Sequence, residues 1–328
     1  MNALEELYNE IRAYKRSRII ATAIHLGILS ALKSQEKAVS LDLLSSELSL
    51  ARDWLSAVLT ILSQYGLVTS NYGLYSLTES GMTAESDRTL KAFAGYHFHC
   101  FESWMHLPEA MKSGKSINFH RQKIKDKDFC KSYLMSMKAI SEPYLDFLEH
   151  ECGSYLKGQI LDIGAGPSCF CRRLARQDKN INIIALDYDE IVLSAREIFG
   201  ETENFRWTAG DFLKWETSSE FDAAYCGHLL EYSSKQKLPV WLRKIRSFIK
   251  NGGYLVIVIF LRDDDNGAPE GIDLFEISTG LNGTNLGYIM TRKEIMTSLQ
   301  MSGFKDITIK TLPEGPSYSE YLVMCQAD

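Results

Sequence analysis

A glycine-rich turn in the second half of the chain carries the residue types best suited to holding a ligand. In QILDIGAGPSCFC a short apolar run ends near Asp162, and Gly164, Ala165 and Gly166 follow it. Glycines in such a turn let the backbone approach a nucleotide-like ligand closely. A dinucleotide fingerprint has a third glycine or alanine where Cys169 stands here. The carboxylate of Asp162 would also repel a phosphate, and it would suit a ligand with a cationic amino group.

Two further acids follow the next strands expected along the chain. Asp187 ends NIIALD, placed for ribose hydroxyls, and Tyr188 comes directly after it. Asp211 follows FRWTA, placed to accept from an adenine amino group, with Phe212 beside the ring. A lone acid after a strand is usually a helix N-cap, but acids at the ends of successive strands indicate one ligand site. S-adenosylmethionine fits this site, because it carries an ammonium and a sulfonium but no phosphate.

From about residue 158 onward the pattern alternates between strands and helices. The strand candidates are QILDI, NIIALD, FRWTA, FDAAYC, GYLVIVIF, FKDITIK and YLVMCQA, with helical candidates between the first five. Alternation with near-continuous apolar strands predicts an α/β fold with a parallel, doubly wound sheet and helices on both faces. No helix of usual length separates the last two strands, so we expect them to pair as an antiparallel hairpin at the sheet edge.

The N-terminal residues 1–85 read as a compact helical unit. IIATAIHLGILSALK keeps helical spacing through Gly27, Ser40 is a candidate N-cap, and Gly66 stops a later amphipathic helix. Two short runs around Asn71-Tyr72-Gly73 predict a hairpin, so the order is that of a winged helix. The helix that would enter a DNA groove has almost no positive charge, which favours a structural or dimerisation unit over a DNA-binding regulator.

The bulk properties are those of a two-domain globular protein. With 328 residues the chain exceeds one ordinary domain of ~100–200 residues. Its formal net charge of -6 gives no electrostatic reason to expect nucleic acid or an anionic membrane as partner. Neither a signal peptide nor an apolar stretch of the ~18–20 residues needed to span a bilayer is visible, so we expect a cytoplasmic protein. The irregular spacing of the seven cysteines, and of His97, His99 and His106, indicates no metal site and no disulfide framework.

These motifs together resemble the plant-type small-molecule O-methyltransferase family, of the caffeate and acetylserotonin type that is common in bacterial natural-product pathways. ATAIHLGILSAL, LLSSELSL, LTILSQYGLV and LYSLTESG are similar to its N-terminal dimerisation domain, and HLPEAMKSGKS and YLMSMKAIS to its connecting helices. ILDIGAGPS, ALDY, AGDFLKW and FIKNGGYLVIV are similar to its cofactor motifs, although the family often has a glycine where Ser168 stands. The resemblance runs nearly end to end.

The resemblance implies a class I, Rossmann-like doubly wound methyltransferase domain with an N-terminal, all-helical winged-helix dimerisation domain. It implies a homodimer in which the N-terminal domain of one subunit closes the acceptor pocket of the other. The expected boundaries are 1–85 for dimerisation, 86–155 for connecting helices and 156–328 for cofactor binding. Cys226 and Gly227, at the end of the fourth strand of that domain, are further expected cofactor contacts.

Aromatic and methionine side chains of the connecting helices and of a late segment are candidates for lining the acceptor pocket. Such residues at helical spacing are more often core than pocket, but in a pocket they favour a flat, largely apolar acceptor. The candidates are Phe98, Phe101, Trp104, Met105, Tyr133, Met137, Phe275 and Asn282.

The chain departs from the family where the catalytic base should stand. In FDAAYCGHLLEYSSKQK the alignment puts Glu231 at the position of the family's usual histidine, and Gly227 where many members have a cofactor-contacting lysine. His228 lies three residues before Glu231, so on a helix the two would share a face. By the resemblance, Ile289 in GYIMTRKEI stands where the family has the carboxylate that orients its base.

Three interpretations of this departure remain open. Glu231, with a raised pKa, could replace histidine as general base, with His228 as a second candidate. Alternatively no base is needed, because the acceptor is already nucleophilic and the enzyme supplies proximity, an effect worth ~7–11 kcal/mol in the best cases. In the third, the fold uses the bound cofactor for a rearrangement, cyclisation or decarboxylation. We expect a methyltransferase that methylates an oxygen atom of a small molecule, with carbon or nitrogen as the alternative acceptor atom. We expect it to require no metal.

Overall fold

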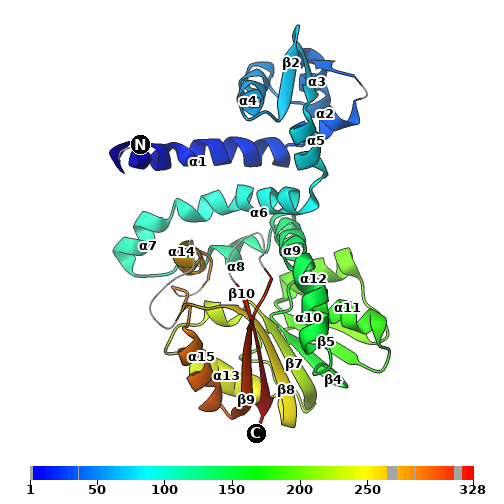
Figure 1. Ribbon diagram of the computed structural model, residues 1–328, viewed down its shortest axis with the longest axis vertical. Coiled ribbons are helices and arrows are strands. Elements are labelled where there is room, and N and C mark those ends of the chain that lie inside the picture. The colour runs from blue at the N-terminus through cyan, green and yellow to red at the C-terminus, as the bar shows by residue number, and fades with distance from the viewer. Residues whose placement is uncertain (1–2, 36, 264–271, 284–285, 314–319) are drawn as a thin grey trace. The chain divides into compact units, whose positions relative to one another are not determined.

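The computed structural model describes residues 3–35, 37–263, 272–283, 286–313 and 320–328. The chain divides into two compact units, Met1–Glu102 and Ser103–Asp328, and each is described by itself (Figure 1). Among the described residues, no helix combines the length and the apolar character that crossing a membrane requires.

The N-terminal unit is mostly helical and includes a small sheet. Its helices are α1 (Ala3–His25), α2 (Ile28–Ser34), α3 (Leu41–Leu48), α4 (Arg52–Gln64), α5 (Glu79–Ser86) and most of α6 (Arg88–Trp104). Its strands β1 (Val39–Ser40), β2 (Val68–Asn71) and β3 (Leu74–Leu77) pair antiparallel in the order β1-β3-β2. The fully buried side chains of Leu44, Leu59 and Leu62 lie in the core between these helices and the hairpin.

The local signals in this unit are confirmed except at Gly27. The Ser40 hydroxyl accepts a hydrogen bond from the Leu43 amide as the N-cap of α3. Gly66 follows the end of α4 with φ 68°, and Tyr72 and Gly73 form the hairpin turn with φ 50° and 78°. The prediction that the helix continues through Gly27 is wrong. Gly27 has φ 72°, a left-handed conformation that ends α1 and lets α2 begin in a new direction.

The second unit opens with connecting helices and continues into the sheet. The helical segments are α7 (Leu107–Ser113), α8 (Phe119–Lys123), α9 (Lys127–Ser141), η1 (Glu142–Tyr144) and α10 (Leu145–Cys152). The strands are β4 (Gln159–Ile163), β5 (Asn182–Asp187), β6 (Phe205–Ala209), β7 (Phe221–Gly227), β8 (Ile249–Phe260), β9 (Phe304–Thr311) and β10 (Glu320–Ala327). All seven strands predicted from the sequence are confirmed.

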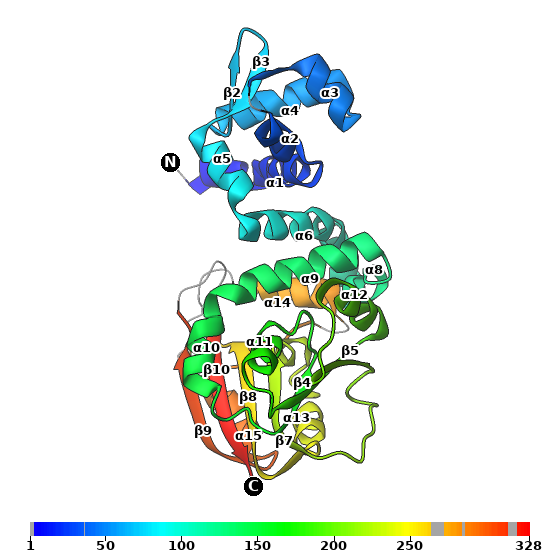
Figure 2. The same cartoon turned by 90° about the vertical axis from the view of Figure 1, so that its right-hand side faces the viewer.

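These seven strands form one sheet in the order β6-β5-β4-β7-β8-β10-β9. The first five strands are parallel, and β10 pairs antiparallel with both β8 and β9, which confirms the predicted hairpin at the edge. Helices α10, α11 (Cys169–Gln177) and α12 (Asp189–Phe199) lie on one face of the sheet, and α13 (Leu238–Arg246) and α15 (Arg292–Gln300) lie on the other (Figures 1 and 2). The short helix η2 (Leu230–Tyr232) follows β7, and α14 (Ile272–Asn282) precedes α15.

One helix expected between the first five strands is missing. Residues 210–220, between β6 and β7, form turns and extended backbone instead. The Asp211 carbonyl oxygen accepts from the amides of Lys214 and Trp215, and this turn leads directly into irregular chain. Trp215 then packs against Phe248, with ring centroids 5.5 Å apart, so the segment is anchored to the core without a helix.

The strand order places the switch point of the fold between β4 and β7. The chain runs outward from β4 through β5 to β6, and it then returns to the other side of β4 as β7. In open α/β sheets, ligands bind at the carboxyl ends of the strands beside this point. The glycine turn after β4 and the loop after β7 therefore meet where a ligand is expected.

Candidate active site

The glycine turn is held against the neighbouring strand by its own backbone. The amides of Gly164 and Ala165 both donate to the carbonyl oxygen of Leu186 in β5, at 2.9 and 3.2 Å. Gly164 and Gly166 have φ of 68° and 49°, the left-handed region that glycine adopts at little cost. A Cβ on Gly164 would lie 3.0 Å from the Leu229 side chain, so the loop after β7 packs closely on this turn.

Asp187, at the end of β5, ties this turn to the next loop. Its Oδ2 accepts from the Gly166 amide at 2.8 Å, and its Oδ1 accepts from the Tyr188 amide at 2.7 Å. A carboxylate has about four acceptor positions, so each oxygen keeps one for a ligand hydroxyl. Burial raises the pKa of Asp187 to about 6, although these two amides act to lower it.

Asp162 lies inside the site and is almost completely buried. Its side chain is 1% exposed, and its Oδ2 accepts a hydrogen bond from the Ser168 hydroxyl. Burial raises the pKa of Asp162 to about 7, and the hydrogen bonds from Ser168 and Cys171 oppose this shift. Ser168, at the position where the family often has glycine, has φ 48° and therefore keeps the left-handed conformation. A buried, partly neutral carboxylate beside the turn disfavours a phosphate and favours a cationic group.

The end of the site that should hold the adenine is built by the chain after β6. Asp211 Oδ1 accepts from the Leu213 amide at 3.1 Å, so part of this carboxylate is used within its own turn. Phe212 is buried and packs edge-on against Trp241, with centroids 5.1 Å apart. Because β6, β5 and β4 are neighbours in the sheet, the sequence-predicted acids Asp162, Asp187 and Asp211 follow adjacent strands.

Sequence reasoning missed a cation at this end of the site. The guanidinium of Arg121, from α8, lies over the Tyr188 ring at 4.1 Å and contacts Glu190 at 2.6 Å. Its charge also acts to lower the pKa of Asp187. Nothing in the spacing of the chain relates α8 to β5, so only the fold reveals this contact.

At the end of β7, Cys226 is fully buried and Gly227 is the last residue of the strand, paired with Val258 of β8. A Cβ on Gly227 would lie 3.2 Å from the Tyr225 hydroxyl oxygen. Tyr225 thus occupies the space beside a position where many family members carry lysine.

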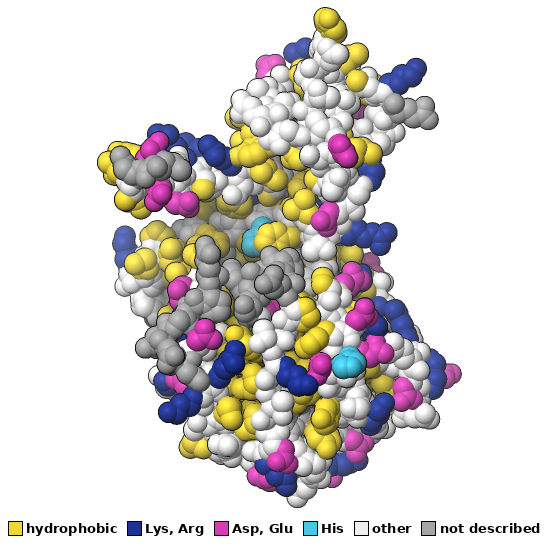
Figure 3. Space-filling view, viewed as in Figure 1, with side chains coloured by type: hydrophobic (Ala, Val, Ile, Leu, Met, Phe, Trp, Pro, Cys, Tyr) yellow, Lys and Arg dark blue, Asp and Glu magenta, His cyan; other side chains and the backbone are white. Residues whose placement is uncertain are grey.

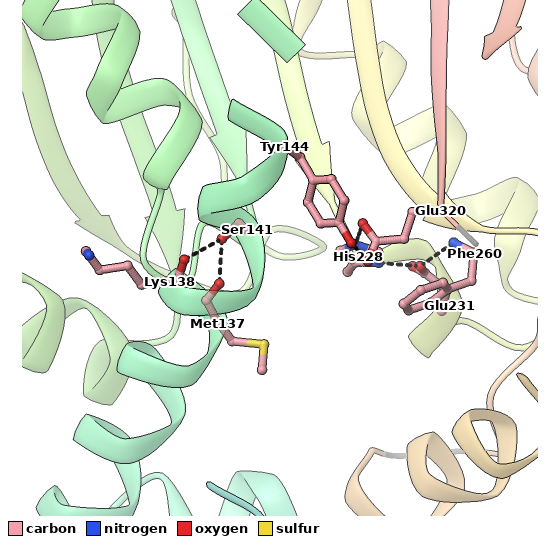
Figure 4. Close-up of polar contacts among 8 residues, drawn as sticks. All are labelled: Met137, Lys138, Ser141, Tyr144, His228, Glu231, Phe260 and Glu320. Atoms are coloured by element: carbon pink, nitrogen blue, oxygen red, sulfur yellow. Dashed lines mark hydrogen bonds and ion pairs between the residues drawn. The ribbon is translucent and has the colours of Figure 1, made fainter. Parts of the chain in front are cut away.

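The sequence-predicted acid–base candidates meet after β7. His228 Nδ1 lies 3.0 Å from Glu231 Oε1, and this same oxygen accepts from the Phe260 amide at 3.0 Å (Figure 4). The pair is not formed on a helix, because His228 has φ 49° and Glu231 lies in the short helix η2. Glu231 is completely buried, so it is not a solvated residue.

A second carboxylate completes this cluster, and sequence reasoning missed it. Glu320, at the start of β10, places its Oε2 at 3.4 Å from His228 Nε2. Its Oε1 accepts a hydrogen bond from the Tyr144 hydroxyl of η1 at 3.4 Å. Burial alone would lower the pKa of His228, but the charges of Glu320 and Glu231 outweigh it and raise the pKa to about 10. Glu320 lies 89 residues beyond Glu231 in the chain, so no local spacing could indicate the contact.

The predicted acceptor-lining residues fall into two groups. In the second unit, the Tyr133 hydroxyl lies 3.9 Å from where a Cβ on Gly166 would stand, and Phe275 packs against Phe260 with centroids 4.7 Å apart. Met137 of α9 lies near Ser141, whose hydroxyl donates to the Met137 and Lys138 carbonyl oxygens (Figure 4).

Other members of that list make contacts of their own. The Asn282 amide group donates to the Ser278 carbonyl oxygen at 2.9 Å. In the N-terminal unit, Phe98 stacks on His25 at 3.8 Å and lies under the Arg18 guanidinium, which also approaches Phe101. Trp104 is half-buried and Met105 is exposed. A role for these residues in binding the acceptor stays a prediction.

The chain matches two known domain families, one in each half. Residues 8–84 match the O-methyltransferase dimerisation domain, and residues 160–253 match the methyltransferase domain. Together the two matches cover about half of the chain. Among curated proteins, the Arabidopsis thaliana protein named Probable thiol methyltransferase 2 is 24% identical over 123 residues. That alignment covers 36% of this chain and 54% of the relative, so the chain spans about half the length of the curated relative it matches.

Solved structures share the fold over the whole chain. PigF with SAH superposes with a TM-score of 0.83 at 16% identity, covering 99% of this chain and 100% of that one. Human N-acetylserotonin methyltransferase in complex with SAM has a TM-score of 0.80 at 17% identity, with coverages of 100% and 98%. The mitomycin 7-O-methyltransferase MmcR has a TM-score of 0.82 at 19% identity, with coverages of 99% and 98%.

The chain is therefore an S-adenosylmethionine-dependent methyltransferase that combines a methyltransferase domain with an O-methyltransferase dimerisation domain. Its cofactor is S-adenosylmethionine. The residues present fit this molecule, because the buried carboxylate of Asp162 and the half-buried carboxylate of Asp187 lie beside the backbone amides of the glycine turn. The expected fold class is confirmed, with the small N-terminal sheet added to the helices.

Replacing Asp187 with asparagine tests the link between the turn and the cofactor. An asparagine has one acceptor oxygen, so its amide group would face the N–H of either Gly166 or Tyr188. Hydrogen bonds to charged groups are worth about 1.5–3 kcal/mol, so we expect the Kd for S-adenosylhomocysteine to rise roughly 10–100-fold in Asp187→Asn. Calorimetric titration measures this change.

Asp189→Asn is the matched control, because this substitution removes the same charge two residues away. Asp189 is exposed in the first turn of α12. Equal weakening in both variants would contradict a specific role for Asp187. A thermal melt of each variant shows whether the fold is retained.

Proposed function

We propose that this protein transfers a methyl group from S-adenosylmethionine to a small, largely apolar or aromatic molecule, with oxygen as the favoured acceptor atom and carbon or nitrogen as alternatives. The observation that carries the proposal is the glycine turn that Asp187 holds at the switch point of the sheet. Asp162, Asp187 and Asp211 lie at or just after the carboxyl ends of the neighbouring strands β4, β5 and β6. The fold shared with the mitomycin 7-O-methyltransferase supports a role in natural-product biosynthesis. Free thiols at all seven cysteines accord with the expected cytoplasmic location.

The residues around the turn divide the cofactor between them. Asp162, Gly164, Ala165 and Gly166 hold the methionine end, where the buried carboxylate offsets the charge of the α-ammonium. Asp187 accepts from the ribose hydroxyls with the acceptor positions that the two amides leave open. Asp211, Phe212 and Tyr188 enclose the adenine, and Cys226 and Gly227 border the cofactor from β7. When bound, S-adenosylmethionine supplies a methyl group on a sulfonium, which is reactive enough to need no metal.

His228 and Glu231 are assigned to the acceptor end of the site. Glu231 holds the ring through Nδ1 and is itself fixed by the Phe260 amide. His228 is the member of this pair that reaches solvent, since its side chain is 34% exposed while Glu231 is 0% exposed. We therefore assign contact with the acceptor to His228, and positioning of His228 to Glu231.

The N-terminal unit is assigned to homodimer formation. One face of α1 carries exposed apolar side chains at helical spacing, and these are Leu4, Leu7, Tyr8, Ile11 and Tyr14, each between 54% and 69% exposed. Figure 3 shows hydrophobic side chains at the surface of α1. An exposed apolar stripe of this kind is typical of a surface that another chain covers. The match of residues 8–84 to a dimerisation domain supports the same assignment.

A DNA-binding role for this unit is not favoured. Arg52, at the start of the helix that would enter a groove, is paired with Asp42 at 2.5 Å and lies 3.9 Å from Asp53. A phosphate would have to displace these carboxylates before it could bind the guanidinium.

Methyl transfer is tested by the products of turnover. The purified protein is incubated with S-adenosylmethionine and a panel of small phenols, enols, amines and thiols, and both products are quantified by mass spectrometry. We expect one methylated product and one S-adenosylhomocysteine per turnover. A converted acceptor without S-adenosylhomocysteine would overturn methyl transfer in favour of a rearrangement, cyclisation or decarboxylation in this fold.

The dimer is tested by sedimentation velocity. We expect the wild-type protein to sediment as a dimer. Ile11→Glu should shift it toward the monomer, because dimer formation would bury the new charge in the apolar stripe of α1. Leu193→Glu is the matched control, since Leu193 is 65% exposed in α12, outside the N-terminal unit. A monomeric wild type, or equal dissociation of both variants, would contradict the assignment.

A further inference from the structure

The cluster around His228 contains two carboxylates and one imidazole ring, an arrangement that the family resemblance does not account for. One imidazole ring lies between two carboxylates, with Nδ1 at 3.0 Å from Glu231 and Nε2 at 3.4 Å from Glu320. Both carboxylates are buried, at 0% and 2% exposure. A neutral imidazole donates through one nitrogen only, so its other lone pair would face a carboxylate oxygen. With both carboxylates ionised, only the imidazolium makes both contacts attractive.

The surroundings hold each carboxylate in place. Glu231 Oε1 accepts from the Phe260 amide, and Glu320 Oε1 accepts from the Tyr144 hydroxyl. The backbone of His228 is held as well, because its amide donates to the Val258 carbonyl oxygen at 2.8 Å. Its φ of 49° is uncommon for a residue other than glycine. Non-glycine residues in this conformation cluster at functional sites.

Other groups near the ring carry no opposing charge. The Phe260 ring packs on His228 with centroids 4.5 Å apart, and the Cys226 thiol, which interacts with Glu231, is neutral because burial raises its pKa. Among the residues that the structure describes, Glu320 and Glu231 are the charged groups that shift the pKa of His228. Glu231 Oε2 is buried with no partner among these same residues, which leaves that carboxylate dependent on His228 and Phe260.

We propose that Glu320 is a positioning residue that, together with Glu231, locks His228 as an imidazolium, so that this chain supplies no general base at the position where the family has one. The acceptor must then offer a lone pair that is already free of a proton at neutral pH, as in an acidic phenol, an enolate, an amine free base or a thiolate. This consequence for the acceptor rests on the proposed function, whereas the charge of His228 does not.

The transfer balances without a base. The acceptor lone pair forms a bond to the methyl carbon while the carbon–sulfur bond breaks, and its electron pair stays on sulfur. A proton that remains on the acceptor atom after transfer leaves to water. His228 contributes a fixed positive charge at the ring that reaches solvent, and the two glutamates leave the cluster with a formal charge of −1.

The raised pKa of His228 determines how the stability of the fold depends on pH. The pKa of His228 is about 10 in the folded protein and about 6.5 in the unfolded chain. The proton on His228 therefore stabilises the fold fully below about pH 6.5, and this contribution is lost as the pH rises through about 10.

The test is a titration of the histidine rings by NMR, observed through long-range proton–nitrogen correlations in the full-length protein without cofactor or acceptor. The chain has seven histidines, and the signals of His228 are assigned by their loss in His228→Asn. We expect His228 to keep both ring protons from pH 5.5 to 8.5. Loss of a proton with a midpoint below pH 8 would overturn the proposal, and this result needs no variant of Glu320.

Glu320→Gln tests the role of the second carboxylate at constant size. We expect it to lower the midpoint of His228 by roughly 1–3 pH units, because one opposite charge is removed. Glu320→Asp should restore part of the shift. Glu109→Gln is the matched control, since Glu109 forms an exposed pair with His106 at 3.5 Å and should leave His228 unchanged. An unchanged midpoint in Glu320→Gln would contradict the assignment of Glu320.

The rate of methyl transfer gives a second readout. In the wild type we expect kcat/KM to show no inflection from an imidazole between pH 6 and 8.5, and Glu320→Gln to introduce one. A wild-type inflection that vanishes in His228→Asn would show a histidine base and would overturn the proposal. Failure to find any methyl acceptor would count against the proposed function alone, because the NMR titration stands without it.

Discussion

The site depends on one carboxylate that joins two loops. Asp187 accepts from the Gly166 amide with one oxygen and from the Tyr188 amide with the other, so the turn after β4 and the loop after β5 share a single anchor. The anchor works only because β4 and β5 are adjacent and parallel, which brings their carboxyl ends together. It requires glycine in the turn, since Gly164 and Gly166 both adopt left-handed conformations. Burial raises the pKa of Asp187, and further hydrogen bonds from ligand hydroxyls therefore stabilise its charged form. The same carboxylate that shapes the turn thus keeps acceptor positions for the hydroxyls of a ligand.

The acceptor end of the site is built on a different principle. His228, Glu231 and Glu320 satisfy one another and leave one ring partly exposed. In the family resemblance, histidine is expected at the position of Glu231, with its carboxylate partner on a later segment. Here the histidine precedes the glutamate by three residues, and the second carboxylate comes from β10. Charges that are already held in place before the reaction stabilise a reacting group effectively. A histidine at position 228 and a glutamate at position 231 are therefore compatible with catalysis.

The strands and the cofactor acids could be predicted from the sequence, because both are local signals. Apolar runs give the strands, and an acid or glycine directly after a run gives a group at its carboxyl end. Gly27 shows where such signals fail, since helical spacing continues on both sides of a residue whose backbone turns the chain. The segment between β6 and β7 shows the same limit, because Trp215 anchors it through a contact with the distant Phe248. Glu320 and Arg121 could not be found from the sequence, since each reaches the site from an element far away in the chain.

The central claim is that Asp162 beside the glycine turn binds the cationic end of S-adenosylmethionine while Asp187 binds its ribose hydroxyls, and calorimetric titration with S-adenosylhomocysteine at several pH values tests it most directly. In the free protein the pKa of Asp162 is raised to about 7 and that of Asp187 to about 6, so both bind protons more tightly than in an unfolded chain. On binding, the α-ammonium should lower the pKa of Asp162, and hydrogen bonds from the ribose hydroxyls should lower the pKa of Asp187. We therefore predict that protons are released on binding near pH 6.5, and that the affinity falls as the pH drops from 8 to 5.5. An affinity that does not change over this range, or proton uptake on binding, would contradict the account.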